Sequence, residues 1–321
     1  MPAAAAQPTE MTSLATNVLS PYTKNANTGN CYEIFFALDF LRRMGLTDAD
    51  LDSMAGLFTT IKAVNHLTAE KIDLSITTVR ARPVGAGYSI GGHKVVALRN
   101  VTQDDGDGGT GDIVLCLADS TELSVSIFAG RKKRDGTIEK CLSNPTCARY
   151  GCTDADKERF KEVASQAVTD YKKEMTSKYG SNEDLWKRKT SVAAVTAQAT
   201  VAADTAKRFN SLPPAERLAR FQDLTRINGG GKPADILCVV NPNSKNYLLF
   251  NIVKSNIDGG DVQVRANSFW LCMSVNGIEV GKTQVKFNNG VYHKGKTSSL
   301  LTSWNASCYM NKVFMLTPVS L

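Results

Sequence analysis

Three side chains between Gly111 and Arg134 are of types suited to phosphate chemistry. Asp112 opens an apolar run typical of a strand, Glu122 opens a second, alternating run, and Lys132 lies in the basic cluster that follows. Carboxylates hold Mg²⁺ in proteins, and a lysine beside the metal steadies the attacking water or the charge that develops during phosphodiester hydrolysis. The pattern therefore predicts a metal-dependent nuclease site, with Asp112 and Glu122 as the metal ligands.

A wider pattern supports this interpretation. A helical segment that carries Glu33, the triplet Gly111-Asp112-Ile113 and the strand segment Val125-Ser126-Ile127 follow one another along the chain. In this order they resemble the PD-(D/E)xK nuclease superfamily, which has the restriction-endonuclease-like fold. The resemblance covers well under half of the chain. It implies a Mg²⁺-dependent, type II-like deoxyribonuclease whose catalytic residues are Asp112, Glu122, Lys132 and Glu33.

The chain departs from the family pattern at the acid-x-Lys element. The family lysine would stand at position 128, where this chain has Phe128, so Glu122 and Lys132 could substitute only from shifted locations. A second segment, Pro233-Ala234-Asp235, looks like the family's P-D element, and Lys254 follows it, but Ile252 stands where an acid is expected. An intact nuclease, a degenerate nuclease fold and an unrelated fold all stay open.

Two basic clusters are candidates for contacts with DNA. The net charge is only +7, which permits phosphate partners without demanding them. Short basic runs can neutralise phosphates with little sequence reading, although they are also common in solvated loops. The expected partner is double-stranded DNA, and the candidate contacts are Arg131, Lys133, Arg134, Lys187, Arg188 and Lys189.

Cations also recur among aromatic residues near the C-terminal end. Interleaved cations and aromatics suit a polynucleotide strand, although exposed hairpins also carry lysine to block edge pairing. The residues concerned are Lys282, Lys286, Lys294, Lys296, Tyr292 and Trp304.

The order of predicted elements indicates a mixed α/β (α+β) fold. Helices come first, then a sheet, then more helices and a second sheet-rich section. We expect a central mixed sheet flanked by helices, with an antiparallel, sheet-rich C-terminal section. The predicted divisions are a flexible N-terminal arm at 1–30, a helix-flanked core with the nuclease-like hairpin at 31–228, and a β-rich section at 229–321. Within the core, Ile72 to Ala81 is β-branched and predicts a strand.

The eight cysteines and the absence of a signal sequence or an apolar membrane span favour an intracellular, reducing setting, in cytoplasm or nucleus. Three of them, Cys141, Cys147 and Cys152, could bind zinc with a fourth ligand from elsewhere, although their spacing matches no zinc ribbon or finger.

A second function from a different class is a non-catalytic structural or assembly protein, for example a component of a virion. The Ala-, Pro- and Asn-rich arm at 1–30 would then order on a neighbouring subunit, including another copy of the chain. Phe128 at the expected lysine position favours this alternative.

Overall fold

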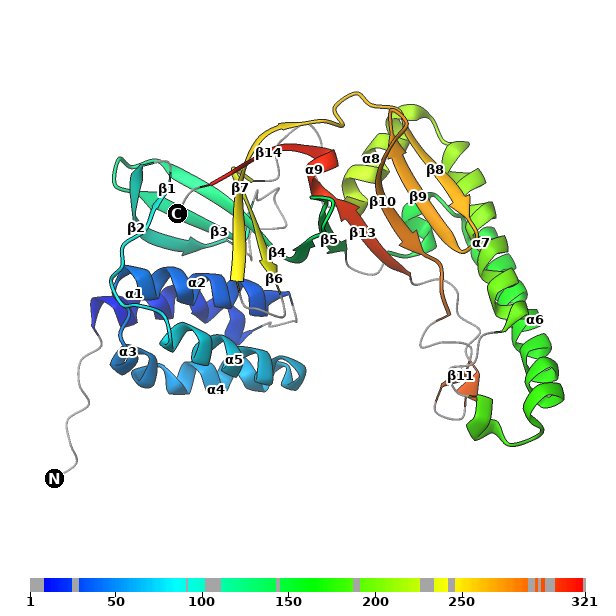
Figure 1. Ribbon diagram of the computed structural model, residues 1–321, viewed down its shortest axis with the longest axis horizontal. Coiled ribbons are helices and arrows are strands. Elements are labelled where there is room, and N and C mark those ends of the chain that lie inside the picture. The colour runs from blue at the N-terminus through cyan, green and yellow to red at the C-terminus, as the bar shows by residue number, and fades with distance from the viewer. Residues whose placement is uncertain are drawn as a thin grey trace. The chain divides into compact units, whose positions relative to one another are not determined.

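The structure is a computed structural model that describes residues 9–24, 29–90, 92–101, 111–142, 145–186, 191–225, 234–241, 246–287, 292–293, 296–297 and 304–319. The chain builds two units and crosses between them four times (Figure 1). Unit 1 comprises 1–131, 232–254 and 315–321, and unit 2 comprises 132–231 and 255–314. The predicted division at 31–228 and 229–321 is therefore wrong, because strands distant in the sequence pair within each unit.

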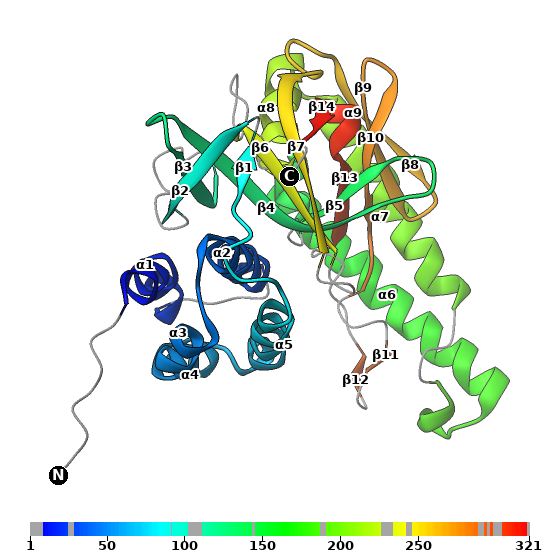
Figure 2. The same cartoon turned by 60° about the vertical axis from the view of Figure 1, so that its left-hand side comes forward.

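Unit 1 has a helical layer against one face of a mixed sheet, and Figure 2 shows several of these helices nearly end-on. The helices are α1 (Glu10–Leu19), η1 (Ser20–Thr23), α2 (Asn30–Met44), α3 (Asp48–Ser53), α4 (Ala55–Val64), η2 (His66–Thr68) and α5 (Ala69–Arg80). Their apolar sides share one core with the sheet residues Ile113, Val125 and Ile236. This packing explains why α2 is buried on every side from Asn30 to Arg42.

The sheet of unit 1 is mixed, as the sequence predicted. The β4–β6 pair is parallel, whereas the pairs β1–β2, β2–β3, β3–β4 and β6–β7 are antiparallel. In order across the sheet, its strands are β1 (Ser89–Ile90), β2 (His93–Asn100), β3 (Ile113–Leu117), β4 (Glu122–Lys132), β6 (Ile236–Asn241), β7 (Asn246–Ser255) and β14 (Phe314–Pro318).

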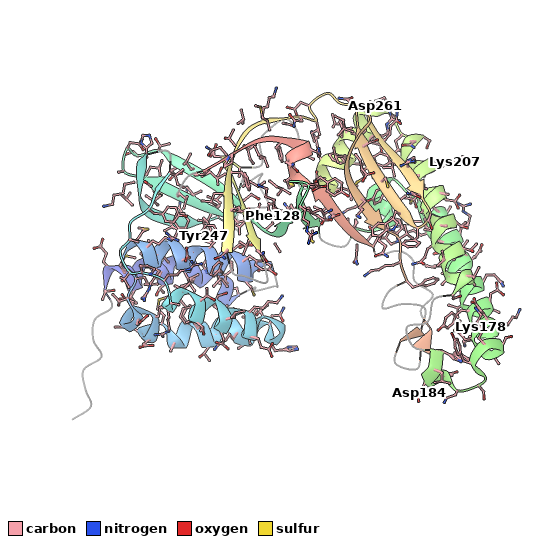
Figure 3. All side chains as sticks on the ribbon, in the orientation of Figure 1. Phe128, Lys178, Asp184, Lys207, Tyr247 and Asp261 are labelled. Atoms are coloured by element: carbon pink, nitrogen blue, oxygen red, sulfur yellow. The ribbon has the colours of Figure 1, made fainter. Side chains whose placement is uncertain are left out.

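A buried ionic cluster ties α2 to the sheet. Asp39, fully buried, accepts a hydrogen bond of 2.7 Å from the hydroxyl of Tyr247 on β7, which Figure 3 labels. Arg43 and Arg82 lie 3.1 and 3.3 Å from the same carboxylate. Burial raises the pKa of the Tyr247 hydroxyl well above its usual value, so this hydroxyl stays protonated and can donate. The two guanidinium groups offset the cost of burying the charge of Asp39.

Unit 2 is an antiparallel sheet with helices against one face. Its sheet runs in the order β5 (Ile138–Leu142), β13 (Asn305–Tyr309), β10 (Ile278–Gln284), β9 (Trp270–Val275) and β8 (Val262–Asn267). Helix α7 packs on β8 and β9, α8 packs on β8, and α6 packs on α7. The remaining elements of this unit are η4 (Cys147–Tyr150), α6 (Asp154–Tyr179), η5 (Glu183–Trp186), α7 (Val192–Asn210), α8 (Pro214–Thr225), β11 (Tyr292–His293), β12 (Lys296–Thr297) and α9 (Met310–Val313).

The mixed α/β class is confirmed. Two local sequence patterns also form the structures that their residue types favour. Thr153 and Asp156 form the capping box that starts α6. Asn276 and Gly277 have φ angles of 51° and 80°, the values that a two-residue hairpin turn between β9 and β10 requires. A second Asn-Gly pair, Asn289-Gly290, lies outside the described residues. Within the described part of the chain, no helix is long and apolar enough to cross a membrane.

Two predictions of local structure are wrong. The segment 72–81 is not a strand: residues 72–80 belong to α5 and Ala81 caps it, because Ile72, Ser75 and Val79 fall on one buried side that packs against α2. That packing outweighs the weak strand preference of β-branched residues.

The predicted flexible arm at 1–30 is also wrong where the structure describes it. Residues 9–24 form α1 and η1, and Ala15, Leu19 and Tyr22 are buried in the core of unit 1. This segment therefore packs on its own chain. Residues 1–8 and 25–28 lie outside the described residues.

Asp50 is the polar group that fastens α1 to the other helices. It accepts hydrogen bonds from the hydroxyls of Thr9 and Thr12 of the α1 segment and from the backbone and hydroxyl of Thr47. Burial by itself would raise the pKa of Asp50, but these hydrogen bonds outweigh it and hold the pKa well below its usual range. The carboxylate is therefore charged throughout the physiological range.

We expect Asp50→Ala to lower the free energy of unfolding by about 1–3 kcal/mol at pH 7, because four donor groups on three threonines lose their acceptor. Since the folded-state pKa is depressed, this contribution is present above the unfolded value near 4 and is lost as the pH falls below it. Urea denaturation at pH 7 and at pH 3 measures the difference. Asp52→Ala is the control: Asp52 is exposed and pairs only with Arg80 among the described contacts, so its loss should cost less than about 1 kcal/mol. Equal losses for the two variants would contradict the role of Asp50.

Candidate nucleic-acid interface

The β3–β4 hairpin forms as predicted, but its register separates the two expected metal ligands. Cys116 lies opposite Glu122, whereas Ile113 lies opposite Val125. Asp112 precedes Cys116 by four residues, so it lies at the other end of the hairpin, roughly 13 Å from Glu122 along the strands. The structure does not bring Asp112 and Glu122 together as a metal site.

The Asp112 carboxylate is a hydrogen-bond acceptor within the sheet of unit 1. It accepts a hydrogen bond from the backbone N–H of Ile127 on β4, and its own N–H donates to Val125. On the other side of β4, Asp235 does the same for Ser124, accepting from its backbone N–H at 3.0 Å and its hydroxyl at 2.9 Å. Each acid stands just before a strand and provides an acceptor where the next ladder bond would otherwise lack one. Sequence reasoning assigned Asp112 to catalysis and treated Asp235 only as part of a segment that looks like the family's P-D element.

The other predicted catalytic residues also have separate surroundings. Glu122 is exposed and pairs with Arg99 at 2.8 Å. Glu33 is buried in α2, where it accepts hydrogen bonds from the Tyr22 hydroxyl at 2.8 Å and from Asn30. Lys132 ends β4, an 11-residue strand that begins at Glu122 and spans roughly 33 Å.

Position 128, where the family lysine would stand, is part of the core. Phe128 is 6% exposed, so neither a cation nor a metal-bound water finds room there without repacking. Figure 3 labels this side chain on its strand. Among the described residues, no three His, Cys, Asp or Glu side chains gather as a metal site would require. The residues present do not fit the predicted Mg²⁺.

The second P-D segment is equally incomplete. Asp235 is engaged with Ser124, its carbonyl accepts from the backbone N–H of Ile252 at 2.9 Å, and Ile252 is buried. Lys254 is exposed two residues further along β7. An apolar side chain therefore occupies the place where an acid would complete the group.

The three cysteines proposed for zinc do not come together. Cys141 is exposed on β5, whereas Cys147 and Cys152 are buried at the two ends of η4. The hydrogen bond between these two thiols lowers the pKa of Cys147, and together with burial it raises the pKa of Cys152. Cys152 also lies 3.8 Å from the Thr205 hydroxyl.

The basic run after β4 forms a tight hairpin turn. The Lys133 N–H donates to Thr137 and Gly136 donates back to Lys133, with Gly136 at a φ of 83°. Lys132 and Arg134 are exposed, whereas Lys133 lies 3.3 Å from Glu139 and over the Tyr309 ring. The side chain of Arg131 lies outside the described set, as do Lys187, Arg188 and Lys189.

The charge of the chain is divided unequally between the units. Unit 2 contains 25 Lys and Arg against 16 Asp and Glu, a net charge of +9. Unit 1 contains 13 against 15, a net charge of −2. The net positive charge of the chain therefore comes from unit 2. The net charge of the whole chain is modest only because the acidic unit 1 offsets part of the charge of unit 2.

One face of the unit 2 sheet carries cations and an aromatic ring. From Lys282 to Phe287 the chain alternates: Thr283, Val285 and Phe287 are buried, while the intervening side chains are half-buried. Trp270 of β9 lies opposite Gln284 of β10. Arg265 of β8 and Lys282 of β10 both lie opposite Cys272 of β9, so they share one cross-strand row. We call this surface the open sheet face; it consists of Arg265, Trp270, Lys282, Gln284 and Lys286.

The C-terminal aromatics differ from the expected set. Trp304, proposed as an interleaved aromatic, is fully buried beside Tyr150, with ring centroids 5.6 Å apart. Trp270 takes the surface position and was missed, although the alternation of β9 was a usable signal. Lys294 and the side chains of Tyr292 and Lys296 lie outside the described residues.

Comparisons of this chain with protein-family models, with curated proteins and with solved structures find no match. The interface is therefore characterised by its own geometry and charge.

We expect Asp112→Ala to lower the free energy of unfolding by about 1–3 kcal/mol, because the Ile127 N–H loses its acceptor. Asp112→Asn keeps a side-chain oxygen at the same position and should cost less than about 1 kcal/mol. Urea denaturation followed by circular dichroism measures both. If the Asn variant is as unstable as the Ala variant, the charge rather than the acceptor is what the sheet requires.

Proposed function

We propose that this chain is a DNA-binding protein that contacts the phosphate backbone through unit 2 and does not cleave it at Asp112. The observation that carries the proposal is the concentration of charge, +9 in unit 2 against −2 in unit 1. A polyanion attracts such a surface by releasing counterions, with little dependence on sequence.

Exposed cations on two parts of unit 2 support the proposal. Lys132 and Arg134 project from the turn after β4, and Arg265 is exposed on the edge strand β8. Many other cations of this unit pair with acids at short range, such as Lys157 with Asp154 and Lys161 with Glu158. Those pairs are less available to phosphate, so the turn and the open sheet face are the stronger candidates.

The family resemblance stays a prediction, and its degenerate form agrees better with the side chains in unit 1. The metal ligands would have to be Asp112 and Glu122, which lie at opposite ends of a hairpin. The lysine position holds buried Phe128. A protein of this kind would keep DNA binding while lacking the metal-dependent step.

Fluorescence anisotropy with a labelled duplex of about 20 base pairs tests the binding. Affinity should fall steeply between 50 and 200 mM salt, because each phosphate contact releases condensed counterions. The double variant Lys132→Gln, Arg134→Gln should reduce the slope of log K against log salt by about 2. The matched control, Lys62→Gln with Lys94→Gln, removes the same charge from unit 1 and should leave the slope unchanged.

Incubation with plasmid DNA and Mg²⁺ or Mn²⁺ tests the absence of cleavage. We expect no nicked or linear product. No duplex binding even at 50 mM salt would contradict the first half of the proposal, and cleavage that Asp112→Asn abolishes would contradict the second.

A further inference from the structure

We propose that the open sheet face of unit 2 binds a single-stranded polynucleotide, with a base stacked on Trp270 and phosphates held by Arg265, Lys282 and Lys286. This inference rests on the proposed binding by unit 2, and it adds the surface and the form of the ligand.

The open sheet face has the cations that such a ligand needs, arranged in rows. Arg265, Cys272 and Lys282 form one cross-strand row, and Asn267, Trp270, Gln284 and Asn305 form the next. Neighbouring strands lie about 4.8 Å apart, and same-face side chains along a strand lie about 7 Å apart. Arg265 and Lys282 therefore lie diagonally beside the indole, each roughly 8–9 Å away. The alternation after Lys282 puts Lys286 on the same face, beyond Gln284.

The indole is placed to accept a base. Trp270 is half-buried, and the Lys282 ammonium lies 4.7 Å from its ring centroid. The Phe269 ring also lies beside the indole, with centroids 5.8 Å apart, whereas the ammonium over the indole is a cation–π contact that a base could replace. When a base stacks there, the flexible lysine can move to the adjoining phosphate, so one side chain serves the free and the bound state.

The chemistry of this face favours a single strand over a duplex. Stacking on an aromatic side chain needs a base whose own face is free, and bases inside a duplex are stacked on each other. The amides of Asn267, Gln284 and Asn305 add donors and acceptors for base edges beside the ring. The antiparallel pairing of β8, β9 and β10, with α7 packed on β8 and β9, holds these groups in rows.

Acidic groups limit the face at its other end. Exposed Glu279 lies opposite Ser274, and it lies 3.5 Å from the Tyr309 hydroxyl. Buried Glu139 is paired with Lys133. Burial, and then the nearby charge of Glu279, raise the pKa of the Cys272 thiol, so this carboxylate reaches the row of Arg265, Cys272 and Lys282. We therefore centre the strand on the next row, at Trp270 and Gln284.

The test compares oligo(dT) of about 20 nucleotides with a duplex of the same length, using the full chain at low salt. We expect the single strand to bind more tightly than the duplex. Trp270→Ala should weaken oligo(dT) binding about ten-fold or more while changing duplex affinity less than about two-fold, because only the single strand loses a stacking partner. Trp270→Phe keeps an aromatic face and should retain most of the affinity.

A second pair of variants tests the contacts between lysine and phosphate. Lys282→Gln should weaken oligo(dT) binding, whereas Lys161→Gln, which removes an exposed charge from α6 in the helical layer, should not. A parallel titration with oligo(U) decides whether the preferred strand is DNA or RNA. Tighter binding of either strand than of the duplex supports the inference.

Tryptophan fluorescence of the wild-type protein provides a second test in case Trp270→Ala does not fold. Trp186 and Trp304 are buried, so quenching of wild-type emission by oligo(dT) should report on Trp270 and disappear in Trp270→Phe. Salt-sensitive duplex binding without quenching, and without a preference for single strands, would overturn this inference while leaving the proposed function intact. No binding to either form would overturn both.

Discussion

Strand β4 is the constraint on which unit 1 depends. It pairs antiparallel with β3 on one side and parallel with β6 on the other, and each neighbour is preceded by an aspartate that accepts from a backbone N–H of β4. Ser124 and Asp235 are 111 residues apart in sequence. A parallel neighbour requires a long crossover connection, and here the segment from Lys132 to Gly231, the larger part of unit 2, forms it.

The same constraint explains why the residues of the predicted nuclease site lie apart in unit 1. Acids at strand starts are useful to a sheet because they supply acceptors where the ladder begins. Asp112 and Asp235 each accept a hydrogen bond from a backbone N–H of β4, and Phe128 packs into the core. The carboxylates and the lysine of the predicted metal site therefore do not lie together. Glu33 is similarly committed to Tyr22 and Asn30 within the helical layer.

The two units distribute polar groups in opposite ways. Unit 1 buries an ionic cluster around Asp39. Arg43, Arg82 and Tyr247 all contact this one buried carboxylate. Unit 2 keeps its excess of cations at the surface. Helices α7 and α8 pack on β8 and β9, whereas Arg265, Lys282 and Trp270, which are exposed or half-buried, share the cross-strand rows of the other face. Its edge strand β8 is protected where Asn210 of α7 bonds both backbone groups of Val264.

The sequence by itself determined what depends on neighbours along the chain. The capping boxes at Thr47 and Thr153, the Asn276-Gly277 turn and the alternation after Lys282 all follow from local geometry, and so does the mixed α/β class. Tertiary structure decided what depends on distant partners. It made a helix of the β-branched segment at 72–81, buried Trp304 while leaving Trp270 at the surface, and separated Asp112 from Glu122 through the hairpin register. Composition and local pattern do not predict these outcomes, because register and burial depend on packing between segments that are distant in the sequence.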